Sequence, residues 1–221
     1  KNDTVKRYLV LLSERTQEEL YESNFMLNLN EALTQDVGFG TGNLYTGWDA
    51  KTIGLNFKSW DIASYRFREN SKGMIDNVKV KYILTAEQAA EEFGNKAGEQ
   101  VLKDADKPET ETNKYEFIHC VKPRKQRNIE LKNTSNMPFE STFVNLKEKV
   151  TVQEGGYEEQ PYAIARWMKA PNEKWGRGQG MTALSIVKTL QRTYKDFIEL
   201  GDKYVNPARE ILQNFEAEYK G

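Results

Sequence analysis

Two stretches decide the fold class: VKVKYIL at residues 78–84 and MTALSIVKTLQRTYKDFIELGDKYV at residues 181–205. In the first, Val78, Val80 and Tyr82 occupy every second position, which is the period of a strand with one buried face. In the second, apolar side chains recur at alternating steps of three and four, which is the period of a helix. The chain therefore combines strand and helix, and its longest helix lies near its C-terminal end.

The same patterns extend outward from these two stretches. Further strands are predicted at 43–48, 53–57, 62–68, 115–121, 139–146, 150–153 and 162–168. Helices are predicted at 3–37, with a break near Ser23-Asn24, and after Thr85, where Gln88 completes a capping box. We expect an α+β fold of short, mostly antiparallel strands flanked by helices, with a long C-terminal helix. The expected division is an α+β region at 1–160, then a strand-to-helix junction and long helix at 161–221.

Charge and length limit the possible functions. The 221 residues include 32 basic and 33 acidic side chains. Dedicated DNA-binding domains carry a clear basic excess, so any contact with DNA is expected to be weak and non-specific. No apolar run is long enough to span a membrane, so no membrane partner is predicted. The sequence starts at Lys1 and enters a helical pattern at once, which predicts a piece of a longer protein.

The composition argues against an enzyme. His119 and Cys120 are the only residues of their types, so neither a disulfide within the chain nor a His/Cys zinc site can form. Both lie in an apolar run that is typical of a buried strand, and we expect them to be structural. Adjacent carboxylates such as Glu18-Glu19 are typical of a solvated helix face. We predict no catalytic residues, no cofactor and no metal.

Two segments have alternative interpretations. The glycines at 176–180 precede a helix, where backbone amides can bind a phosphate, but no Walker lysine follows and a helix entry is favoured. The basic segment contains Lys122, Arg124, Lys125 and Arg127. It predicts a solubilising loop or a subunit contact more than a phosphate contact.

A structural role is predicted for a group of residues around the last strand and the long helix. The group consists of Arg166, Trp167, Trp175, Gly176, Arg177, Gly178, Asn206 and Pro207. We expect the tryptophans to hold the junction by burial and the arginines to bind carboxylates or carbonyls. Pro207 should end or kink the helix because it lacks an amide donor.

The order of these motifs resembles the head-to-tail connector (portal) family of short-tailed phages. The resemblance rests on Gln160-Pro161-Tyr162, Ala165-Arg166-Trp167, Lys174-Trp175-Gly176-Arg177-Gly178 and Val205-Asn206-Pro207, with upstream support from Val37-Gly38-Phe39-Gly40-Thr41-Gly42. Two positions depart from the family pattern: Gln179-Gly180 stands where Pro-Ala is common, and Pro207-Ala208 where Pro-Pro is frequent. Both affect the ends of the helix.

The resemblance implies a non-enzymatic subunit of a ring at one capsid vertex, with twelve copies around a channel for double-stranded DNA. Implied partners are the other ring subunits, terminase, tail or adaptor proteins, and capsid and scaffold proteins. The implied location is the virion, after assembly in the host bacterial cytoplasm. Residues up to about 160 resemble the wing of such a subunit, and the helix from Met181 resembles the start of its stem. Two alternatives remain: a nucleotide-dependent enzyme that uses Gly176–Gly180, and a non-portal capsid or adhesin module.

Overall fold

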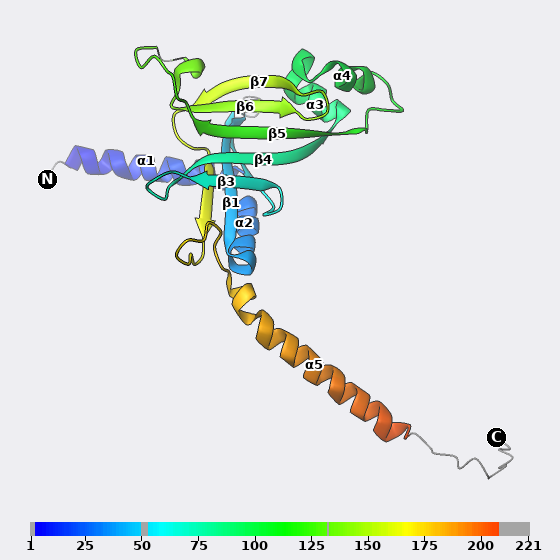
Figure 1. Cartoon of the computed structure of the whole chain (residues 1–221). Helices are drawn as coiled ribbons and strands as arrows, with labels where there is room; N and C mark the ends of the chain where they lie inside the picture. Colours follow the sequence, from blue (N-terminus) through cyan, green and yellow to red (C-terminus); the bar gives the residue numbers. More distant parts are fainter. Residues whose placement is uncertain (1–2, 50–52, 132, 208–221) are drawn as a thin grey trace, which may run out of the picture. The chain divides into compact units, whose positions relative to one another are not determined.

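The computed structural model describes residues 3–49, 53–131 and 133–207 (Figure 1). The chain divides into two compact units, Lys1–Gln179 and Gly180–Gly221. The first unit contains both sheets and every helix except the last. The predicted α+β class is confirmed.

The N-terminal helices are α1 (Asp3–Glu22) and α2 (Phe25–Phe39), and the predicted break between them is confirmed. Asn24 holds the break in place. Its side-chain amide donates to Asn56 Oδ1 and to the Phe57 carbonyl, both at 2.9 Å, and its Oδ1 accepts from the Phe57 amide at 2.8 Å. These bonds attach the break to residues 56 and 57. No described residue of α1 is buried.

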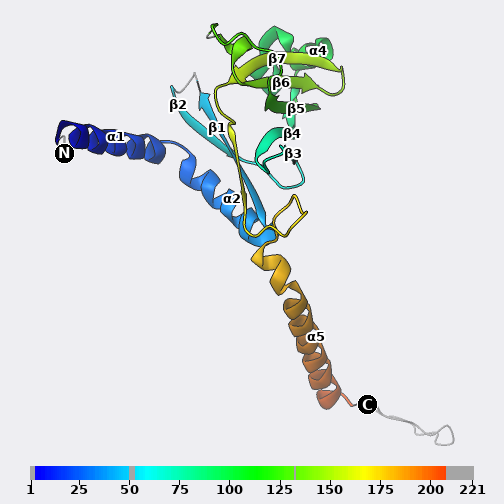
Figure 2. The same ribbon diagram turned by 60° about the vertical axis from the view of Figure 1, so that its left-hand side comes forward.

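A small sheet contains β1 (Thr41–Asp49), β2 (Gly54–Ser59) and β8 (Tyr162–Arg166). Its order is β2-β1-β8, and both pairings are antiparallel. Helix α2 runs along β1 (Figure 2). The two approach closely at Gly42, where an added Cβ atom would lie 2.3 Å from the Ala32 carbonyl oxygen. β8 therefore belongs to the first unit, although the division expected from the sequence, at residue 160, placed it with the C-terminal helix.

The large sheet is an antiparallel meander, ordered β3-β4-β5-β6-β7. Its strands are β3 (Tyr65–Glu69), β4 (Ile75–Thr85), β5 (Lys114–Pro123), β6 (Phe139–Asn145) and β7 (Val150–Tyr157). Between β4 and β5 lie α3 (Ala86–Phe93), the 3₁₀ turn η1 (Gly94–Lys96) and α4 (Glu99–Ala105), and η2 (Thr134–Asn136) precedes β6. The Thr85–Gln88 capping box at the start of α3 is confirmed.

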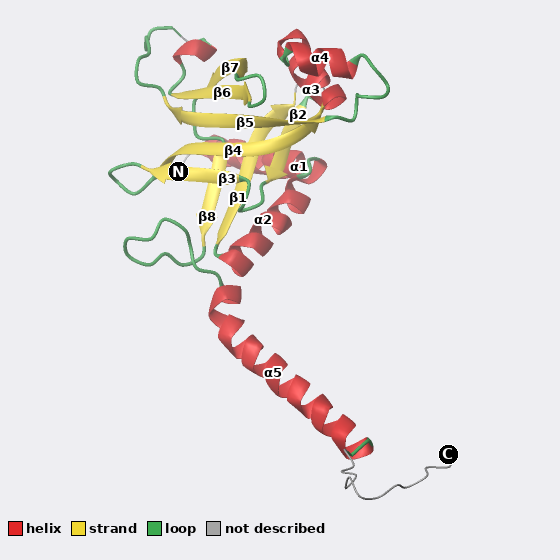
Figure 3. Cartoon of the chain, turned by 45° about the vertical axis from the view of Figure 1, so that its right-hand side comes forward, coloured by secondary structure: helices red, strands yellow, loops and turns green. Residues whose placement is uncertain are grey.

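Helices α3 and α4 and the small sheet cover different ends of the same face of the large sheet (Figure 3). The pairings Val80 with His119 and Tyr82 with Phe117 place these side chains on one face, as the alternation predicted. Phe117 packs with Phe93 under the helices, whereas Val80 packs in the cluster that contains Tyr162 of β8. The opposite face of β4 and β5 carries charged side chains, such as Lys81 paired with Glu116.

The second unit contains most of α5 (Gln179–Val205), which confirms the predicted long C-terminal helix. At about 1.5 Å per residue its 27 residues extend about 40 Å. None of its described residues is buried. Within the described ranges, no helix has both the length and the apolar character needed to cross a bilayer.

Candidate contact sites

Three glycines form a close backbone contact between the end of α2 and the segment that follows β8. We call Gly40, Gly176 and Gly178 the glycine clasp. Gly40 has a φ of +86° and its carbonyl accepts from the Trp167 amide at 3.1 Å. An added Cβ on Gly176 would lie 1.8 Å from the Gly40 carbonyl oxygen, and one on Gly178 would lie 2.5 Å from the Val37 carbonyl oxygen. Both positions therefore require glycine.

The amides of the clasp are used inside the protein. The Gly176 amide donates to Thr41 Oγ1 at 2.9 Å, and the Arg177 amide donates to the Met168 carbonyl at 2.7 Å. A phosphate-binding loop needs such amides directed at the ligand. The geometry therefore favours the predicted helix entry over a nucleotide site.

Arg166 lies in an ion-pair cluster between β8 and β3. Its guanidinium pairs with the Glu69 carboxylate and donates to the Lys174 carbonyl at 3.1 Å. Lys169 Nζ lies 2.6 Å from the same carboxylate. Hydrogen bonds from Lys169 and Arg166 hold the pKa of Glu69 below its ordinary value. The cluster links the end of β8 to the neighbouring sheet.

The two tryptophans of the junction differ in how they pack. The Trp175 ring packs against Phe67 with centroids 4.6 Å apart and against Tyr65 at 5.5 Å. Trp167 is 49% exposed, so the prediction that it holds the junction by burial is wrong. The physical reason is the strand period: β8 directs Tyr162 and Arg166 inward, and Trp167 falls on the opposite, uncovered side.

The remaining residues of the predicted structural group lie at exposed positions. Arg177 pairs with Glu173 on the surface, and the hydrogen bond from Arg177 lowers the pKa of Glu173. Asn206 and Pro207 directly follow the end of α5, and the Asn206 amide donates to the Asp202 carbonyl at 2.8 Å. The helix ends at Val205, two residues before Pro207, as the Asn206-Pro207 pair predicted.

Two cations of the basic segment, Lys122 and Arg124, bind groups of the same chain. Lys122 pairs with Glu140 on β6 at 2.7 Å, which raises the pKa of Lys122. Arg124 donates to the Met137 carbonyl at 3.2 Å and to the Gly155 carbonyl at 2.9 Å. Lys122, Arg124 and Lys125 line one depression of about 370 Å³, and Arg127 is exposed nearby in the sequence. Within residues 122–131, Lys125 and Arg127 form no ion pair with a described residue, so they are the cations of this stretch left for a partner.

His119 belongs to a buried polar network. Its Nδ1 lies 2.6 Å from the Tyr162 hydroxyl, and its Nε2 lies 2.8 Å from Ser141 Oγ. The ring stacks on Phe143 with centroids 3.9 Å apart. Burial lowers the pKa of His119 to about 3, so the ring is neutral at ordinary pH. Burial also raises the pKa of the Cys120 thiol. This environment agrees with a structural role for both residues.

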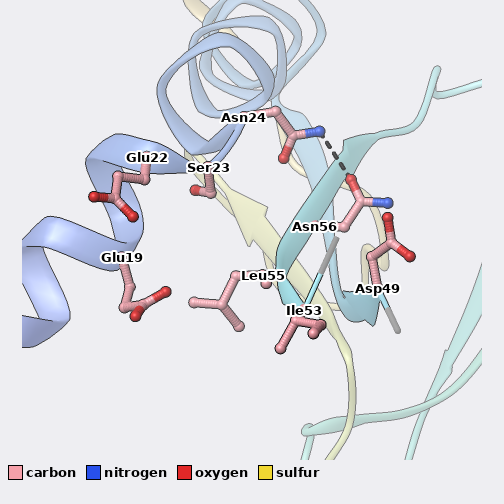
Figure 4. A pocket seen from close by; sticks show the side chains of 9 residues that line it. Glu19, Glu22, Ser23, Asn24, Asp49, Ile53, Leu55 and Asn56 are labelled. Carbon is pink, nitrogen blue, oxygen red and sulfur yellow. Dashed lines mark hydrogen bonds between the residues drawn. The ribbon is translucent and has the colours of Figure 1, made fainter. Parts of the chain in front are cut away.

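An acidic pocket lies at the α1–α2 junction and was not predicted. Its volume is about 390 Å³, and Glu19, Glu22, Asp49 and Asn56 are among its lining residues (Figure 4). Glu19 also pairs with Arg15 at 2.8 Å. The spacing of three between the glutamates was an available signal, because it puts both on one helix face. The approach of Asp49 from β1 depends on tertiary structure.

An apolar groove of about 310 Å³ lies where α2 meets β1 and β8. Its walls include Leu29, Leu33, Leu44 and Ile164. Asp36 also lines it, although this side chain is only 6% exposed, and Asp36 Oδ1 accepts no hydrogen bond from the described residues. The spacing of Leu29 and Leu33 is typical of an apolar stripe on a helix, but it does not indicate the groove. In the described ranges, no three His, Cys, Asp or Glu side chains are placed to bind a metal ion together.

Comparison with known proteins gives one family and two relatives. Residues 1–220 match the family described as bacteriophage head to tail connecting protein. The chain is 26% identical over 207 residues to the portal protein of Salmonella phage epsilon15, covering 92% of this chain and 37% of the relative. It is 24% identical over 193 residues to the probable portal protein of Bordetella phage BPP-1, covering 86% of this chain and 34% of the relative. The chain thus spans about a third of the length of these relatives.

Proposed function

Because the chain belongs to the family of bacteriophage head to tail connecting proteins, we propose that it is part of a structural subunit of a phage portal ring. In this role copies of the protein surround a channel at one capsid vertex, and double-stranded DNA passes through it during packaging and ejection. The observation that carries the proposal is the family match over residues 1–220.

The electrostatics support a channel component more than a DNA-gripping domain. The formal net charge is −1, and Lys122 is paired with a carboxylate inside the chain. Affinity for duplex DNA comes largely from cations that neutralise phosphates, so a chain whose 33 acidic side chains offset its 32 basic ones is expected to let DNA slide. The partners we propose are further copies of the subunit, terminase, tail or adaptor proteins, and capsid and scaffold proteins. The location is the portal vertex of the virion, reached by assembly in the host bacterial cytoplasm.

Two cations of the basic segment are candidates for these partner contacts. Lys125 and Arg127 are exposed on the segment between β5 and β6. We propose that they contact a neighbouring protein rather than DNA. Replacing both with glutamate should weaken capture of that protein while leaving DNA retention unchanged. A matched pair, Lys72→Glu with Lys174→Glu, changes the same charge at two other exposed positions.

Electron microscopy of the protein expressed at the full length of its gene tests the proposal. We expect closed rings of twelve copies around an open channel. A protein that remains monomeric at high concentration would contradict it.

The alternative is that the protein is a nucleotide-dependent enzyme that uses Gly176–Gly180, and it should be tested alongside the portal proposal. We expect no ATPase and no nuclease turnover from the purified protein, because the Gly176 and Arg177 amides are already hydrogen-bonded. A turnover that disappears in Arg177→Ala, but not in Lys174→Ala, would favour an enzyme.

A further inference from the structure

The face of β3 and β4 that points away from the small sheet carries cations that its own chain does not neutralise. Arg66 and Arg68 on β3 and Lys79 on β4 are exposed, and they form no ion pair with a described residue. Arg66 lies directly opposite Lys79 in the strand register, and like charges in such a pair repel each other. We call these three residues the basic sheet patch. Its charge favours a contact with carboxylates from outside the chain.

The basic sheet patch borders a shallow depression of about 270 Å³. Arg66, Lys79 and Lys81 line this depression, and Ile118 of β5 adds an apolar side chain to it. Lys81 is already paired with a carboxylate of the sheet. Ile83 lies on the same face of β4 as Lys81 and is 55% exposed. A partner that fits this surface therefore combines carboxylates with an apolar side chain.

The C-terminal half of α1 has this combination. Residues 14–22 contain four glutamates and one arginine, Arg15, which pairs with two of them. One face of the helix carries four residues at steps of three and four: Leu11, Glu14, Glu18 and Glu22. Leu11 is 63% exposed, and Glu14 and Glu22 form no ion pair with a described residue. We call these four residues the acidic face of α1.

The two surfaces cannot meet within one copy. Helix α1 contacts α2 and β2, and β2 belongs to the small sheet, which packs on the opposite face of the large sheet from the basic sheet patch. Ser23 and Asn24 alone separate α1 from α2, and Asn24 is hydrogen-bonded to β2. Helix α1 therefore cannot reach the patch of its own copy without breaking these bonds (Figure 2).

We propose that the acidic face of α1 of one copy lies on the basic sheet patch of the next copy. Two different surfaces of one subunit then form a head-to-tail interface, which is the kind that closes into a ring. A helix laid on the open face of a sheet is also the usual way in which such a face is covered. The inference rests on the proposed ring and names two surfaces that form it.

The arrangement of the charges supports a second copy as the partner. Glutamates four residues apart on a helix lie about 6 Å apart along its axis, and alternate residues of a strand lie about 7 Å apart. Carboxylates of α1 can therefore face successive cations of the sheet when the helix follows the strands. The formal net charge of the chain is −1, so two copies approach without strong overall repulsion. Complementary patches then select the register.

Charge reversal in the protein at the full length of its gene tests the contact, with the fraction of protein in rings counted by electron microscopy. Arg66→Glu with Lys79→Glu should lower that fraction by about five-fold or more, because the patch would then repel the carboxylates of α1. Glu14→Lys with Glu22→Lys should lower it in the same way. All four changes together should restore it to within about two-fold of the unsubstituted protein, because opposite charges face each other again.

The matched control is Lys96→Glu with Lys107→Glu, which makes the same change of charge at exposed positions beside α3 and α4 and should leave the rings unchanged. Rings that survive reversal of the patch, or that the four combined changes do not restore, would overturn the inference and leave the portal assignment standing. Loss of rings on reversal of the patch but not of α1 would show a different anionic partner and overturn it as well. Absence of rings in the unsubstituted protein would contradict the proposed function and the inference with it.

Discussion

At the residue scale, burial lowers the pKa of His119 and keeps its ring neutral in the folded chain. Tyr162 and Ser141 satisfy both ring nitrogens of the neutral form, and Phe143 covers one face of the ring. Only one proton is available to the two nitrogens of a neutral imidazole, so one hydroxyl donates and the other accepts. A charged ring would lose this arrangement and would be buried without a counter-ion.

His119 gives a pH prediction. Its pKa is about 3 in the folded chain, against about 6.5 for an ordinary histidine. The unfolded chain therefore binds the proton first, and the stability contributed by the neutral ring is lost as the pH falls from about 6.5 towards about 3. The slope should be small near pH 7 and should approach about 1.4 kcal/mol per pH unit as the pH falls well below about 6.5. Chemical denaturation between pH 7 and pH 5 measures it.

The control for this prediction is His119→Gln, which keeps a donor and an acceptor but does not titrate. Because His119 is the only histidine, the variant should show a flatter dependence of unfolding free energy on pH in that range. Parallel curves for the two proteins would contradict the assignment.

The two tryptophans give a second prediction at this scale. Trp175→Ala removes the ring packed on Phe67 and Tyr65, and should lower the free energy of unfolding by about 3 kcal/mol. Trp167→Ala removes a half-exposed ring and should lower it by less than about 1 kcal/mol. Denaturant titration measures the free energy of unfolding of both variants, and equal losses would contradict the difference in packing.

At the element scale, the glycine clasp joins the end of α2 to the segment that leads into α5. The contact is between backbones, so it is sensitive to a single carbon atom. The Thr41 hydroxyl adds a hydrogen bond to the Gly176 amide at 2.9 Å. The turn at Gly40 and the tight approach of Gly176 therefore depend on each other.

Gly176→Ala tests the clasp. The new Cβ would lie 1.8 Å from the Gly40 carbonyl oxygen, so the backbone must shift, and we expect a loss of at least about 2 kcal/mol in unfolding free energy. Gly38→Ala is the matched control, because an added Cβ there meets nothing within 4 Å and Gly38 lies in α2. That substitution should leave stability unchanged or raise it by up to about 1 kcal/mol, through helix propensity. A harmless Gly176→Ala would disprove the close contact.

At the scale of the whole molecule, uncovered apolar surface is the main feature. Leu184, Val187, Tyr194 and Ile198 of α5 are between 43% and 67% exposed. Exposed stripes of this length associate. We predict that this 221-residue chain is a monomer or a weak, concentration-dependent oligomer, whereas the protein at the full length of its gene forms closed rings.

Light scattering over a range of concentrations checks the prediction. Leu184→Glu with Ile198→Glu should reduce self-association of the chain, whereas Thr193→Glu, on the other side of α5, should not. A stable twelve-subunit ring from this chain alone would show that it contains all the contacts needed for closure.

The sequence by itself determined the local elements and the family. The alternation at 78–84 predicted β4, the Thr85–Gln88 spacing predicted the cap of α3, and the helical period at 181–205 predicted α5. These patterns arise from neighbours a few residues apart, so they can be recognised without the fold. The order of short motifs gave the family in the same way.

Only the tertiary structure decided which surfaces meet. Thr41 and Gly176 are in contact although 135 residues separate them, and Trp175 is packed while Trp167 is exposed. Periodicity shows that a strand has an apolar face, but it does not show which element covers that face or where the cover ends. The acidic pocket and the groove beside Asp36 likewise combine elements from distant parts of the chain. Their existence depends on the packing of whole sheets and helices, which no local pattern encodes.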